Sequence, residues 1–222
     1  MIVNTPASRQ GNLIRYIFYL IGYLMVAGAF KLVTMNSPIH IWDLILFITI
    51  SLMVLLFFIY RFNREQRFFD RSYSGSWLNN FGLIIASTIV ITVLRIFVSW
   101  LQSTGKLKMY HFQIAYLHHE STLAYWFLVL ALGVVIPVLQ EFLITGFLFN
   151  YAFRKNTVMT AVLGIIVSGV LFSLLNWQDS ITLLLVNALF GAIFAWSYLH
   201  TQTIWMPIYL AVLNSVILII MT

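Results

Sequence analysis

Long apolar stretches, each about the length of a membrane-spanning helix, take up most of this chain. A bilayer core about 30 Å thick needs roughly 20 mostly apolar residues in helical form. Within it, only helices and closed barrels satisfy every backbone N–H and C=O group. The sequence therefore predicts an all-α, polytopic transmembrane helical bundle of about seven spans, at residues 13–34, 41–60, 78–101, 122–153, 157–177, 180–199 and 203–221.

The composition leaves no room for a soluble domain of any size. Of the 222 residues, 62% are hydrophobic and 8% are charged, whereas soluble domains carry about 25% charged residues. The net charge of +6 comes from basic residues beside the spans, so we expect membrane lipid as a partner and no nucleic acid. The polar start of the chain carries no small-residue cleavage site, and we expect the first span to be retained.

Basic residues are distributed unequally between the two sides of the predicted bundle. One side carries Lys106 and Lys108, and the other carries Arg9, Arg15, Arg61, Arg64, Arg67, Arg71, Arg154 and Lys155. Because cytoplasmic loops are enriched in Lys and Arg, we predict a multi-pass protein of the cell membrane with a cytoplasmic N-terminus. Seven spans would then place the C-terminus outside.

Three further charged features each allow two interpretations. Lys31 and Arg95 are either functional charges within the membrane or, as we favour, side chains that extend to the outer headgroups. The basic and aromatic stretch 61–71 is equally compatible with an amphipathic surface helix and with a topology signal. His118, His119 and Glu120, with His111 nearby, have the chemistry of zinc ligands, but adjacent histidines rarely point the same way and we favour an exposed polar collar.

Polar residues inside the later spans are the candidates for a functional site. Pro137 is expected to kink the long fourth span, because proline lacks a backbone donor and clashes with the preceding turn. The polar residues that follow it within the spans are Gln140, Glu141, Thr145, Asn176, Asn214 and Ser215. From spacing alone, interhelical hydrogen bonding is the simpler interpretation of this set.

The order of three motifs resembles the CAAX protease and bacteriocin-processing family, also called Abi, over roughly residues 120–222. The family's first motif is a proline followed by Glu-Glu-x-x-x-Arg-Gly, and residues 137–146 read Pro-Val-Leu-Gln-Glu-Phe-Leu-Ile-Thr-Gly. The second is Phe-x-x-x-His after small residues, and residues 168–176 read Ser-Gly-Val-Leu-Phe-Ser-Leu-Leu-Asn. Residues 198–208 resemble the approach to the family's last helix. The resemblance implies a family core at 121–222, preceded by an N-terminal unit at 1–120 with three transmembrane helices.

The side chains that carry the family's chemistry are replaced. The resemblance implies that the first glutamate of the pair acts as general base, but this position holds Gln140, whose carboxamide cannot take a proton near neutral pH. Glu141 remains, while Thr145 replaces the arginine, and Asn176 and Ala211 replace the two histidines. Asn214 and Ser215 stand at the end of the last motif. We therefore expect no intact catalytic set, no metal site and no cofactor.

Two functions follow as hypotheses. The favoured one is a non-catalytic homologue of an intramembrane protease, acting as a membrane scaffold or regulator, or as a bacteriocin self-immunity protein, by binding a membrane or cell-envelope partner. The alternative is an active CAAX-type endopeptidase that uses Glu141. In the favoured case we expect Glu141 to be neutral and to hydrogen-bond Thr145 or Asn176, with the distant cation Arg95 as the alternative partner.

Overall fold

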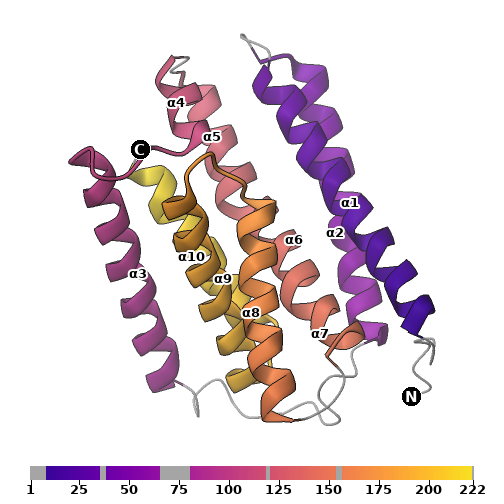
Figure 1. The fold of residues 1–222 in the computed structure, drawn as a ribbon. Coiled ribbons are helices and arrows are strands. Elements are labelled where there is room, and N and C mark those ends of the chain that lie inside the picture. The colour runs from indigo at the N-terminus through magenta and orange to yellow at the C-terminus, as the bar shows by residue number, and fades with distance from the viewer. Residues whose placement is uncertain (1–8, 36–38, 66–80, 119–120, 154–156, 222) are drawn as a thin grey trace.

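The computed structural model describes residues 9–35, 39–65, 81–118, 121–153 and 157–221. All regular structure in these segments is helical (Figure 1). Six of the helical stretches are long and apolar enough to cross a membrane, and a seventh, α10, is apolar but shorter. The all-α membrane bundle expected from the sequence is therefore confirmed.

The N-terminal half contributes three long helices and one short one. These are α1 (Arg9–Met35), α2 (Ile41–Glu65), α3 (Phe81–Ser103) and α4 (His111–His118). The last three helices of the chain are α8 (Val158–Leu175), α9 (Ile181–Thr201) and α10 (Trp205–Ile220). Large apolar side chains are widely exposed along four of these helices, α1, α2, α3 and α8. Lipid-facing helices require such exposure.

The predicted fourth span is a single helical path whose winding changes along its length. It runs through α5 (Thr122–Leu130), η2 (Ala131–Val135), α6 (Ile136–Glu141), η3 (Phe142–Phe147) and α7 (Leu148–Tyr151), where η2 and η3 are π-helical. Pro137 lies in the first turn of α6, directly after η2. Where a kink at Pro137 was expected, the structure records a widened, π-helical turn before the proline, and such turns often occur at functional sites.

This irregular span lies at the centre of the bundle. In its most apolar window 67% of the residues are buried, against 22% in α2 and α3. The α1–α2 pair packs along α6, η3 and α7, while α3 packs on the other side of the molecule against α10 (Figure 1). The helices before residue 120 therefore flank the C-terminal helices on two sides.

Small residues allow α8 and α9 to pack unusually closely. A Cβ added to Gly169 would lie 2.5 Å from the carbonyl oxygen of Ala188, and one added to Gly191 would lie 2.5 Å from Cβ of Phe172. Small residues at helix contacts let backbones approach within a membrane, where dispersion rather than hydrophobicity drives association. This contact fixes the end of α8, which carries Asn176.

Candidate functional site

A cavity of about 940 Å³ opens at the end of the bundle that carries α4. Its walls come from α1, α3, α4, α5, η2, α6, α8, α9 and α10. Much of this lining is apolar, as with Phe30, Phe127 and Leu132. Its polar lining includes Arg95, Tyr110, Gln140, Asn176, Asn187 and Asn214. An apolar hollow with a few converging polar groups is the usual form of a small-molecule site.

The first part of the polar lining is a pair of amides. The Gln140 amide nitrogen lies 3.3 Å from Oδ1 of Asn176, and the Asn176 amide nitrogen lies 3.3 Å from Oε1 of Gln140. Gln140 also donates to the hydroxyl of Tyr23 at 2.7 Å, and Asn176 donates to the carbonyl of Phe172 at 2.9 Å. The two side chains therefore satisfy each other and their nearest neighbours.

The second part of the lining continues the same network to a buried cation. Asn187 donates to the backbone carbonyl of Asn176 at 3.1 Å and accepts from the Tyr110 hydroxyl at 3.1 Å. Arg95 donates from Nη1 to the Tyr110 hydroxyl at 3.2 Å and from Nε to Oδ1 of Asn214 at 2.8 Å. One hydrogen-bonded chain thus connects α1, α3, α6, α9 and α10 around the cavity.

The end of α3 explains how Tyr110 reaches Arg95. Gly105 adopts a left-handed conformation with φ +71°. Its N–H bonds the carbonyl of Gln102, and the N–H of Lys106 bonds that of Leu101, which is the Schellman pattern of a helix end. The chain folds back over α3, where the Gln102 amide donates to the Lys108 carbonyl at 2.9 Å.

The structure separates the predicted site residues into two groups. Gln140, Asn176, Asn214 and Ser215 line the cavity. The other three, Glu141, Thr145 and Ala211, are also buried but do not belong to its lining. The α6 helix therefore presents Gln140, rather than the neighbouring carboxyl, to the cavity.

Glu141 has one recorded side-chain hydrogen-bond partner among the described residues. The Thr145 hydroxyl lies 3.2 Å from Oε2 of Glu141 and 2.5 Å from its backbone carbonyl oxygen. Of the possible partners weighed for Glu141, Thr145 is the one in contact, because Asn176 pairs with Gln140 and Arg95 bonds to other groups. A carboxyl buried with one hydroxyl is the setting in which a neutral acid is favoured.

The expectation that Arg95 extends to the headgroups is wrong. Its side chain is 1% exposed, and its guanidinium carbon lies 4.5 Å from the centre of the Phe190 ring. The reason is the buried face of α3, which carries Ser87, Arg95, Ser99 and Gln102 and packs on α10. Lys31, by contrast, is exposed on α1.

The cavity lacks the donor set for a zinc ion. Zinc in proteins is held by thiolate, imidazole and carboxylate ligands, and the polar lining offers mainly carboxamides and hydroxyls with the guanidinium of Arg95. His111 lies at the rim and forms an ion pair with Asp179 at 3.0 Å. Across the described residues, no three His, Cys, Asp or Glu side chains gather, while His119, Glu120 and the His118 side chain lie outside that description.

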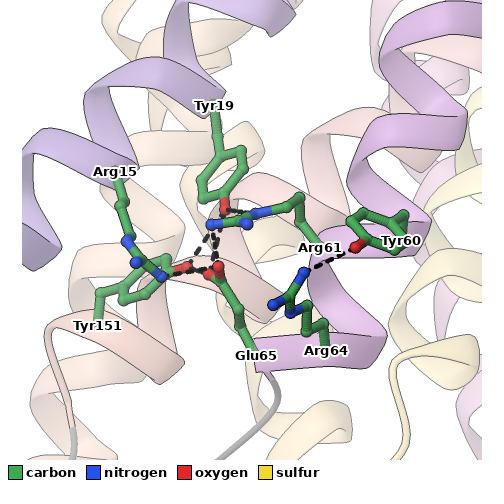
Figure 2. Close-up of polar contacts among 7 residues, drawn as sticks. All are labelled: Arg15, Tyr19, Tyr60, Arg61, Arg64, Glu65 and Tyr151. Atoms are coloured by element: carbon green, nitrogen blue, oxygen red, sulfur yellow. Dashed lines mark hydrogen bonds and ion pairs between the residues drawn. The ribbon is translucent and has the colours of Figure 1, made fainter. Parts of the chain in front are cut away.

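A second polar cluster at the opposite end of the bundle was not predicted. Glu65, the last residue of α2, is fully buried and forms ion pairs with Arg15 and Arg61, the first at 2.8 Å (Figure 2). The hydroxyls of Tyr19 and Tyr151 also donate to its carboxylate. The cluster joins α1, α2 and α7. The sequence signal that could have indicated it is the presence of tyrosines in apolar spans, because their hydroxyls need partners.

The comparison with protein families agrees with the placement of the site. A family model described as type II CAAX prenyl endopeptidase Rce1-like matches residues 122–217. This part of the chain is therefore similar to the Rce1-like family. Comparisons with curated proteins and with solved structures gave no match. The matched segment begins at α5 and ends within α10, so it contains Gln140 and Asn176, whereas Arg95 and Tyr110 reach the cavity from outside the Rce1-like region.

Proposed function

We propose that this protein is a non-catalytic Rce1-like membrane protein, which acts as a scaffold or regulator by binding a membrane or cell-envelope partner. The observation that carries the proposal is the reciprocal amide pair of Gln140 and Asn176. By the motif alignment these two side chains stand where the family resemblance implies a general base and a histidine.

The amide pair removes the acid–base chemistry of the site. A carboxamide neither accepts nor releases a proton near neutral pH, and general acid–base catalysis contributes roughly 10²–10⁴-fold to an enzymatic rate. Ala211, at the position of the other histidine, contributes no polar atom. Losing these groups together brings the expected hydrolysis rate close to that of the uncatalysed reaction.

The position of Glu141 weighs against an endopeptidase built on the remaining carboxyl. A general base must lie within hydrogen-bond reach of the water that it activates. Glu141 is 1% exposed and faces Thr145 rather than the cavity. A substrate lying in the cavity would meet Gln140 first.

Cleavage of peptides tests the non-catalytic assignment. The purified full chain, in liposomes, is incubated with a peptide library beside an Rce1-like endopeptidase that retains the Glu-Glu motif. We expect products from that enzyme only. Cleavage by this chain that Glu141→Gln abolishes would establish the alternative, whereas equal background from both forms supports the proposal.

The nature of the partner is tested by phenotype and by co-purification. If the partner is a bacteriocin target, expression in a sensitive strain protects the cells, and Glu141→Gln protects them equally because no catalysis is involved. If it is an envelope enzyme or sensor, the tagged protein retains one membrane protein in stoichiometric amount. A chain that gives no protection and purifies alone from its native membrane contradicts the proposal.

A further inference from the structure

Among the residues that the structure describes, the cation in the cavity has no matching anion. Among the described residues no carboxylate lies within ion-pair distance of Arg95, and its hydrogen-bond acceptors are the neutral groups of Asn214 and Tyr110. A guanidinium carries five N–H donors, and these two bonds use two of them. Burying a charge whose partners are all neutral is costly.

Further unused donors lie beside Arg95 in the same lining. The structure records no acceptor among the described residues for the side-chain N–H groups of Asn214 or the hydroxyl of Ser215, and both residues line the cavity. The free N–H groups of Arg95 and the Asn214 amide lie next to each other, because Arg95 bonds Asn214, and Ser215 shares the same lining. These donors suit one anionic group, because charge-assisted hydrogen bonds from a guanidinium fork to carboxylate or phosphate are short and strong.

The rest of the lining limits what can be attached to that anionic group. The side chains of Gln140 and Asn176 use their donors and acceptors on each other and on neighbouring protein groups. Asn187 likewise donates to Asn176 and accepts from Tyr110. A peptide would bring many backbone polar groups that these side chains cannot satisfy. The remaining walls, from residues such as Phe30, Phe127 and Leu132, are apolar.

We propose that the cavity binds a lipid-like amphiphile with one anionic headgroup, carboxylate or phosphate, which is held by Arg95 with Asn214 and Ser215 while its apolar chain lies between α1 and α5. The cavity volume of about 940 Å³ lies at the upper end of the roughly 300–1,000 Å³ typical of small-molecule sites. The proposal goes beyond the proposed function and does not depend on it.

Binding of tritiated palmitate to the purified full chain in micelles tests this assignment. We expect saturable binding that unlabelled palmitate and phosphatidic acid displace, while palmitate methyl ester and inorganic phosphate do not. The stronger of the two displacing ligands identifies the source as a fatty acid or a phospholipid. Equal displacement by the methyl ester would overturn the proposal, because that ligand keeps the chain and lacks the charge.

Two matched variants assign the anion to Arg95. Arg95→Gln is expected to weaken palmitate binding about 10–100-fold, the range expected for loss of charge-assisted hydrogen bonds. Lys31→Gln removes the same charge from an exposed position on α1 and is expected to bind as the wild type does. Equal affinities for Arg95→Gln and Lys31→Gln would refute the role of Arg95.

A third variant decides the matter if Arg95→Gln does not fold. Ala27→Trp fills the cavity from the α1 wall and leaves Arg95 in place, so it is expected to abolish saturable binding. Unchanged binding in Ala27→Trp would place the ligand elsewhere and overturn the proposal. Peptide cleavage by the wild type would refute the non-catalytic assignment and leave these binding results unchanged, so the two failures are distinguishable.

Discussion

Two buried carboxyls provide a paired test of how charge is handled in this bundle. Glu65 is fully buried against Arg15 and Arg61, whereas Glu141 is buried with only the Thr145 hydroxyl. We expect Glu65 to contribute to stability through its ion pairs with Arg15 and Arg61, and Glu141 to contribute no ion pair among the described residues. Replacing each by glutamine keeps the shape, removes the capacity to carry charge and turns one acceptor oxygen into an N–H donor.

The structure sets the size of the expected difference. Breaking a buried ion pair by removing one partner costs roughly 3–5 kcal/mol. The Arg15 and Arg61 side chains are 29% and 22% exposed, so solvent and headgroups recover part of this, and we expect Glu65→Gln to lower the free energy of unfolding by about 3 kcal/mol. Glu141→Gln keeps an acceptor for Thr145, so we expect it to change the free energy of unfolding by less than about 1 kcal/mol.

Unfolding in mixed micelles, followed by far-ultraviolet circular dichroism as the denaturing detergent is increased, measures both values. Asp179→Asn is the matched control, because it makes the same chemical change in a surface pair with His111, where Asp179 is 74% exposed. Exposed pairs contribute at most about 1 kcal/mol. A loss in Glu141→Gln equal to or greater than that in Glu65→Gln would refute the different contributions assigned to the two carboxyls.

Three further predictions concern packing, the polar chain and orientation. Gly169→Ala, whose new Cβ meets a carbonyl oxygen at 2.5 Å, should lower the unfolding free energy by about 1–3 kcal/mol in the same titration. Gly28→Ala, with open space around it, should not, and equal losses would contradict the close packing of α8 on α9. Tyr110→Phe removes the hydroxyl that links the guanidinium to α9 and should weaken palmitate binding several-fold, whereas unchanged affinity would show that this link does not position the cation. Because the chain has no cysteine, single cysteines report topology: an impermeant maleimide applied to intact cells should label Lys106→Cys and not Arg64→Cys, and the reverse pattern would contradict a cytoplasmic N-terminus.

The helical bundle was predictable because the length and apolarity of the spans depend on the bilayer and not on tertiary contacts. The expected spans at 122–153 and 180–199 agree with the observed helices within a few residues. The π-helical turns η2 and η3 were not predictable in the same way. Pro137 indicates an irregularity, but the neighbouring helices determine whether the backbone kinks or widens.

The candidate site was only partly predictable, because its chemistry depends on helices far apart in sequence. The motifs identified Gln140 and Asn176, whose direct contact the structure records. No motif contains Arg95, and its place near a span end suggested an exposed side chain. Only the packing of α3 on α10 and the turn at Gly105 bring it into the polar lining. Similarly, Glu65 is part of a basic stretch in the sequence, and its burial depends on Tyr19 and Tyr151 from other helices.

An experimental structure of the protein purified from its native membrane, at a resolution that shows side chains, tests the central claim most directly. We expect elongated density in the cavity that ends beside the Arg95 guanidinium, with the Gln140 and Asn176 amides still paired. Density for a metal ion or an ordered water held by Glu141 and facing the cavity would contradict it, because the site would then retain hydrolytic chemistry.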